Sequence, residues 1–265
     1  MIQGEKTRQA RTSHYIAIDS VHDELIVPNP FAQALLFFHG GVNGNEAPIR
    51  IIQGPKTLMN QPDNVAVDPV HREVFTAQFT TDSILVFRSD VGGDVEPIRI
   101  LHGPNTKLDR PIRVEVDPIN NLIAVVTDSA ISVYNRTDSG DVAPKWTISG
   151  PKTGVGTRFG TRDVKLFPEG KKIIAGGAIR APQADGRAER QPVDTGDDVE
   201  FRGGKRFVGV WKYGDNGDIG PWAALNNTPA TRISGSRLAL NPKAGELITG
   251  GNGQVTVYHL PEIFQ

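Results

Sequence analysis

Polar and charged side chains recur directly before a set of short apolar runs, at positions where a repeated fold would bring them together. The residues at these positions, with one close neighbour, are Tyr15, Asn64, Arg110, Arg113, Asp163 and Arg237. An arginine fork binds a carboxylate or phosphate through two N–H groups. We therefore expect a rim that binds a protein partner or a small anionic ligand. The alternative is a solvated rim on which arginine and aspartate only pair with one another.

Two residues further along the chain, the aligned positions hold alanine in three copies and opposite charges in two, Glu115 and Lys165. We expect these two side chains to form an ion pair between neighbouring copies. As structure, the pair would fix packing. As function, it would be an acid–base pair or a ligand clamp with shifted pKa values.

Other catalytic chemistry has little support in the residue types. The chain has no cysteine, which removes disulfides, thiol catalysis and cysteine-bound metals. Its 6 histidines are scattered, and no Gly-x-Ser-x-Gly elbow occurs. These observations favour a non-catalytic protein without a cofactor.

Charge and hydropathy narrow the choice of partners. The net charge of -1 is unlike the basic excess of most nucleic-acid-binding domains, so a nucleic-acid partner is not expected. No apolar stretch approaches the roughly 18 residues that cross a bilayer. The first residues do not resemble a secretory signal, so the sequence assigns no compartment.

The elements that would position these residues come from an internal repeat. The first apolar run of each copy ends at position 19, 68, 117, 167 or 241, so the spacings are 49, 49, 50 and 74 residues. Each copy continues with further β-rich runs separated by Gly, Asn or Asp turns. Four such runs make one antiparallel blade, and stacked blades bury the faces that a single blade leaves exposed. The sequence predicts an all-β propeller of five four-stranded repeats.

The whole chain, residues 1–265, is predicted to form this single domain. Ile2-Gln3-Gly4 matches Ile52-Gln53-Gly54, so we expect the N-terminal residues to complete the last blade. The last repeat has only three apolar runs, the third at Val255–Tyr258. An incomplete six-bladed ring is the alternative.

The fourth repeat carries an insertion at residues 178–206 that is rich in both charges and poor in apolar residues. This composition indicates a loop between the second and third strands. As a hypothesis, the loop contacts a partner through Arg187, Arg190, Asp197 and Asp198.

The repeat resembles a known family in the segments Pro62-Asp63-Asn64-Val65-Ala66-Val67-Asp68-Pro69, Ser83-Ile84-Leu85-Val86-Phe87 and Gly93-Asp94-Val95-Glu96-Pro97-Ile98-Arg99. These look like NHL-type propeller repeats, which occur in many bacterial and often exported proteins. The resemblance implies a propeller and suggests export. It leaves the function open, because the family includes protein-binding, RNA-binding and enzymatic members. Such propellers more often have six blades.

Some six-bladed propellers of lactonase type hold a divalent cation with Glu, Asn and Asp. By residue type alone, Asn64, Glu115 and Asp163 would supply oxygen ligands for Ca²⁺ or Mg²⁺.

From the polar rim, the charged insertion and the lack of catalytic motifs, we expect a non-catalytic binding or scaffold module for a protein partner or larger assembly. The alternative is a metal-assisted hydrolase of lactonase type.

Overall fold

The computed structural model describes the chain apart from residues 1, 11–14, 157–160, 181–203, 227, 229–232, 234–236 and 252. Its strands form five antiparallel sheets. The chain divides into two compact units: unit 1 is Met1–Asp128 with Ser132–Lys145, and unit 2 is Ser129–Ile131 with Trp146–Gln265. None of the described helices is long and apolar enough to cross a membrane.

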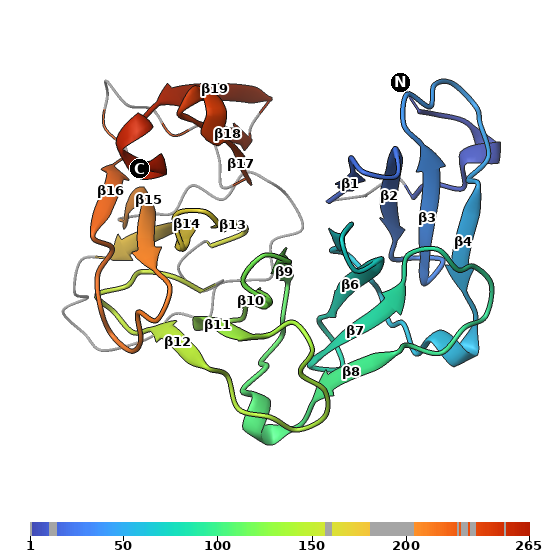
Figure 1. The fold of residues 1–265 in the computed structure, drawn as a ribbon, viewed down its shortest axis with the longest axis horizontal. Coiled ribbons are helices and arrows are strands. Elements are labelled where there is room, and N and C mark those ends of the chain that lie inside the picture. The colour runs from blue at the N-terminus through green and yellow to red at the C-terminus, as the bar shows by residue number, and fades with distance from the viewer. Residues whose placement is uncertain are drawn as a thin grey trace. The chain divides into compact units, whose positions relative to one another are not determined.

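Blades 1 to 3 each have four strands in chain order (Figure 1). Blade 1 contains β1 (Ala17–Asp19), β2 (Glu24–Asn29), β3 (Ala34–His39) and β4 (Arg50–Gln53). Blade 2 contains β5 (Ala66–Asp68), β6 (Glu73–Gln78), β7 (Ser83–Arg88) and β8 (Arg99–His102). Blade 3 contains β9 (Arg113–Asp117), β10 (Leu122–Val126), β11 (Ala130–Asn135) and β12 (Trp146–Ser149).

The last two blades differ in strand number. Blade 4 contains β13 (Val164–Phe167), β14 (Lys172–Arg180), β15 (Gly204–Lys212) and β16 (Ala223–Asn226). Blade 5 has three described strands: β17 (Arg237–Asn241), β18 (Glu246–Gly251) and β19 (Gln254–His259). Short 3-10 helices lie at η1 (Glu5–Thr7), η2 (Pro55–Thr57), η3 (Pro104–Thr106), η5 (Pro242–Ala244) and η6 (Pro261–Phe264).

This arrangement confirms the predicted all-β propeller repeat. Alternating side chains on the strands explain why the blades stack. On blade 1, Leu35, Phe37 and Ile52 point to one face and pack in one core cluster with Val74 and Leu85 of blade 2. Similar core clusters join blades 2 and 3 in unit 1 and blades 4 and 5 in unit 2, so neighbouring blades bury one another within each unit.

The aspartate that ends the first strand of a blade shapes the following turn. Asp68 Oδ1 accepts the N–H groups of Val70 and His71, both at 2.9 Å, and its Oδ2 lies 2.7 Å from His71 Nδ1. Asp19 and Asp117 make the same backbone contacts. The recurrence of these residues is therefore explained by a turn and not by a catalytic site.

A second repeated contact joins the end of a fourth strand to the next blade. Gln53 N–H donates to Gly93 O at 3.0 Å, Gly93 N–H donates to Ile51 O at 2.7 Å, and Lys56 N–H donates to Asp94 Oδ1 at 2.8 Å. The equivalent acceptors are Asp141 in blade 3, which accepts the N–H of Asn105, and Asp218 in blade 4, which accepts the N–H of Lys152. We call this contact the blade link.

The N-terminal residues make the blade link as well. Ile2 forms a parallel bridge with Gly44, and Lys6 N–H donates to Asn45 Oδ1 at 2.8 Å. Residues 2–7 thus resemble the end of a fourth strand placed before blade 1. That they complete blade 5, and that the ring has five or six blades, stay predictions.

Buried charges join the blades of unit 1 near the outer strands. Glu24 accepts from Arg50 Nη1 and Nη2 at 2.7 and 2.6 Å, and Arg50 Nη2 also donates to Ser89 O in blade 2. Glu73 accepts from Arg99 at 2.6 Å and from Arg136, which belongs to blade 3. Burial alone would raise the pKa of Glu73, but the two guanidinium groups outweigh it and lower the pKa below its usual value.

We expect Glu73→Gln to lower the free energy of unfolding by about 3–5 kcal/mol at pH 7, because it leaves buried arginine charge uncompensated. Since the folded pKa of Glu73 is lowered, its stabilisation is present above the unfolded pKa and is lost as pH falls through the folded pKa. The difference in free energy of unfolding between the unchanged protein and Glu73→Gln should therefore become smaller as the pH falls. Urea unfolding from pH 7 to about 3 measures both effects.

Glu96→Gln, at an exposed glutamate of the same blade, is the matched control and should change stability by less than about 0.5 kcal/mol. Equal losses for the two variants would contradict the role given to Glu73.

Candidate binding site

Arg113, predicted to lie on a binding rim, is held inside unit 1. It is the first residue of β9 and is 4% exposed. Its guanidinium lies 4.6 Å from the centre of the Tyr15 ring, and its Nη2 donates to Glu115 Oε2 at 2.9 Å. An aromatic face and a carboxylate thus compensate this buried charge.

Asn64 joins the same group of residues through the backbone. Its side chain is fully buried, and its Oδ1 accepts the N–H of Val114 at 2.8 Å. Its backbone oxygen accepts from Thr76 Oγ1 at 2.8 Å. Within the described part of the chain, the buried Asn64 Nδ2 has no acceptor. This amide is therefore a donor that a bound polar group could use, although its other end holds the first strand of blade 3.

Asp163 makes the corresponding contact in unit 2, where its side chain accepts a backbone N–H of the next blade. It is 3% exposed, its Oδ1 accepts the N–H of Val164 at 3.0 Å, and its Oδ2 accepts the N–H of Leu238 at 2.9 Å. Arg237, next to Leu238, donates from Nη1 to Arg162 O at 3.3 Å. Burial lowers the pKa of the Arg237 guanidinium. Asn64 and Asp163 therefore hold the start of the next blade's first strand in their own units.

These contacts bear on the metal hypothesis. The side-chain oxygen of Asn64 and both oxygens of Asp163 already accept backbone N–H groups, and Glu115 is paired with Arg113. Among the described residues, no group of three or more His, Asp or Glu is placed to hold a metal ion. The geometry of each unit favours a structural role for this donor set. The Glu115–Lys165 pair would join two units and stays a prediction.

Arg110 is the exposed member of the predicted rim. Its side chain is 50% exposed and lies 5.1 Å from the centre of the Phe79 ring. Its backbone N–H donates to Asp82 Oδ1 at 2.7 Å, and its Nη2 lies 3.5 Å from Asp128 Oδ1. The loop before β9 is thereby tied to the loop between β6 and β7.

Exposed apolar side chains lie in the loops before first strands and between second and third strands of unit 1. Phe31, between β2 and β3, is 77% exposed, Leu58, before β5, is 56% exposed, and Phe79, after β6, is 37% exposed. In an antiparallel blade the loop between the second and third strands and the loop before the first strand emerge at one end of the strands. We call Phe31, Leu58, Phe79 and Arg110 the rim surface.

The two phenylalanines of the rim surface, Phe31 and Phe79, were not among the site residues predicted from the sequence. The signal was an aromatic residue in the turn between the second and third apolar runs of two successive repeats, at Phe31 and Phe79. The residues named for the predicted partner loop, Arg187, Arg190, Asp197 and Asp198, are outside the described residues. β14 and β15 lead into and out of that loop, and pair as far as Arg180 and Gly204.

Comparison with known proteins supports the fold. No protein-family model matches the chain, and no curated protein matches it. Among solved structures, hydrazine synthase of Kuenenia stuttgartiensis is similar, with a TM-score of 0.57, 15% identity, and coverage of 95% of this chain and 59% of that one. The WD40 β-propeller domain of Doa1 has a TM-score of 0.55 at 8% identity, with 92% and 63% covered.

A third similar structure is a putative 6-phosphogluconolactonase of Bacteroides uniformis. Its TM-score is 0.55 at 16% identity, and the match covers 96% of this chain and 67% of that chain. At these identities the likeness shows a β-propeller and nothing finer. The chain spans about three fifths to two thirds of the length of these proteins. The NHL-type resemblance stays a resemblance.

We expect Asn64→Ala to lower the free energy of unfolding by about 1–3 kcal/mol, because the Val114 N–H loses its acceptor in a buried place. Asn64→Asp keeps an acceptor there, as the chain itself does at the aligned Asp163, and should cost less. Urea unfolding of the two variants checks the order. Equal losses would show that the amide acceptor is not what matters.

Proposed function

We propose that this protein is a non-catalytic binding module that holds a protein partner on the rim surface of unit 1. The observation that carries the proposal is the exposed Arg110 guanidinium lying on the exposed Phe79 ring. Aromatic and arginine side chains dominate the binding energy of protein interfaces, so an exposed pair of this kind is a suitable hot spot.

Rigid loops support the proposal. Gln78 Oε1 accepts the N–H of Asn60 at 2.7 Å, and Gln53 Nε2 donates to Ala32 O at 2.9 Å. The loops that carry Phe79 and Phe31 are thus tied to neighbouring segments. Side chains held in place before binding lose less conformational entropy when a partner arrives.

The chemistry of the buried residues also favours binding over catalysis. Asn64, Arg113 and Asp163, the residues best suited to a reaction, are buried. Asn64 Oδ1 and Asp163 Oδ2 accept backbone N–H groups, and Arg113 Nη2 pairs with Glu115. Arg110 alone of these four offers an exposed charged group. The function that the geometry supports is therefore recognition at the loops.

We expect the double variant Phe79→Ala/Arg110→Ala to recover at least tenfold less of the partner than the unchanged protein, because each truncated hot-spot residue commonly costs about 2 kcal/mol or more. The measurement is an affinity pull-down from an extract of the native source, quantified by mass spectrometry. Melting curves of both proteins establish that the variant is folded.

Val70→Ala is the matched control. Val70 is 68% exposed in the same unit, in the turn after β5 at the opposite end of the strands. Its variant should recover the partner normally. Loss of the partner with Val70→Ala, or its retention by the double variant, would contradict binding at the rim surface.

A further inference from the structure

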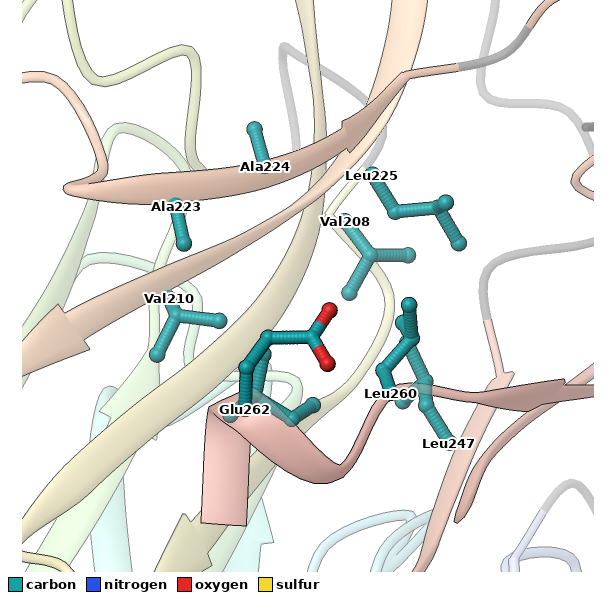
Figure 2. Close-up of a pocket in the computed structure, with 9 residues that line it drawn as sticks. Val208, Val210, Ala223, Ala224, Leu225, Leu247, Leu260 and Glu262 are labelled. Carbon is teal, nitrogen blue, oxygen red and sulfur yellow. The ribbon is translucent and has the colours of Figure 1, made fainter. Parts of the chain in front are cut away.

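A small pocket of about 100 Å³ lies between blades 4 and 5, within unit 2 (Figure 2). Its walls are apolar side chains such as Val208, Leu225 and Leu247, and Glu262 is the charged member of its lining. One carboxylate beside apolar walls selects no particular ligand. Groups that are placed to react with one another lie instead in the turns that carry the blade link.

Two asparagines stand directly before the glycine of a blade link, in the turn between the third and fourth strands. They are Asn43 in blade 1 and Asn216 in blade 4, and the aligned residues of blades 2 and 3 are Gly92 and Ser139. An asparagine followed by glycine is open to an intramolecular reaction, because glycine has no side chain to hinder the approach of its amide nitrogen to the asparagine side chain. Both asparagines are exposed, so access of water does not distinguish them.

In blade 4 the two groups that would react are each bound to β12. Gly217 N–H donates to Thr147 O at 2.7 Å, and Asn216 Oδ1 accepts the N–H of Thr147 at 2.8 Å. The N–H groups of Gly93 and Gly140 likewise donate to a carbonyl of the preceding blade, both at 2.7 Å. The amide nitrogen of Gly217 would therefore have to leave β12 before it could reach the side chain of Asn216.

In blade 1 the corresponding two groups contact each other. Gly44 N–H donates to Asn43 Oδ1 at 2.9 Å, so the nitrogen lies beside the side-chain carbonyl group. The N–H of Asn43 donates to Glu46 Oε1 at 3.1 Å, which closes this turn on itself. The same turn takes part in the blade link, because Gly44 O accepts the N–H of Gln3 at 3.0 Å.

We propose that Asn43 is a site of spontaneous deamidation and that the blade link protects Asn216 from the same reaction. The deprotonated Gly44 nitrogen forms a bond to Asn43 Cγ, the bond from Cγ to the side-chain nitrogen breaks, and ammonia leaves. Water then opens the cyclic imide at either of its carbonyl carbons. The products are aspartate, or isoaspartate, in which the main chain runs through Cβ and Cγ. The reaction is independent of the rim surface.

The isoaspartate product alters the blade link of blade 1. Its main chain is longer by one carbon atom, so Gly44 O no longer meets the N–H of Gln3. Asn45, whose Oδ1 accepts the N–H of Lys6 at 2.8 Å, moves with it. We therefore expect hydrogen exchange at the amides of Gln3 and Lys6 to be faster in the isoaspartate form, because exchange follows local opening.

Peptide mapping by mass spectrometry measures the reaction in the full-length protein, incubated in mildly alkaline buffer below its melting temperature. Asn43 should react at least about tenfold faster than Asn216, because the two hydrogen bonds to Thr147 must break first in blade 4. In concentrated urea, which removes the blade link, the two rates should agree within about threefold. Equal rates in the folded protein, or a tenfold difference that persists in urea, would overturn the proposal.

Two variants separate the modification from its effect on the contact. Asn43→Ser, which copies the aligned Ser139, should remove the reaction at this position and keep exchange at Gln3 and Lys6 slow after incubation. Asn43→Asp supplies the charge of the aspartate product without the longer main chain, so exchange in the fresh variant should also be slow.

Hydrogen exchange of fresh and incubated proteins, with isoaspartate counted by isoaspartate-specific methylation, checks both variants against the unchanged protein. Unchanged exchange at Gln3 and Lys6 in a sample rich in isoaspartate would refute the effect on the blade link. Fast exchange in fresh Asn43→Asp would assign that effect to charge and refute it as well.

Discussion

The structure of each unit depends on the contact that joins the end of one blade to the loop before the fourth strand of the next. At Gly54 the backbone has φ of +136°, and a Cβ atom there would lie 2.4 Å from the Asp94 side chain. Glycine is therefore required both for its backbone conformation and for the approach of the carboxylate. The threonine three residues later folds back, with Thr57 Oγ1 donating to Gly54 O at 2.7 Å. The repeated Gly-Pro-x-Thr and Gly-Asp segments are two halves of one contact.

A second set of contacts between blades serves the same purpose with different chemistry. Blades 1 and 2 use glutamate and arginine, and blade 2 shares its glutamate with Arg136 of blade 3. At the aligned place in unit 2, the Trp146 and Tyr213 rings lie with centroids 6.2 Å apart. Blade 4 uses Lys172, which binds backbone oxygens of the C-terminal residues. A buried charge needs a compensating partner, and the glutamates of blades 1 and 2 and Lys172 of blade 4 each have one.

The strands could be predicted from sequence because short apolar runs separated by Gly, Asn and Asp turns recur in five aligned copies. The end of the last repeat after its third apolar run is visible in the same way. Side-chain roles were harder to predict. Asn64 and Asp163 look like rim residues in sequence, yet each reaches into the next blade to hold a backbone N–H, as at Val114. That contact joins residues 50 positions apart, and no local pattern reveals it.

The division of the blade link between neighbouring repeats has a consequence for how such a chain can change in length. Each repeat in blades 2 and 3 contains an acceptor aspartate for the blade before it and, about ten residues later, a glycine turn for the blade after it. A tandem duplication of one 49-residue stretch of the gene would therefore produce a new junction whose two sides already fit. Growth or loss of whole repeats by recombination therefore requires no compensating substitution at that contact.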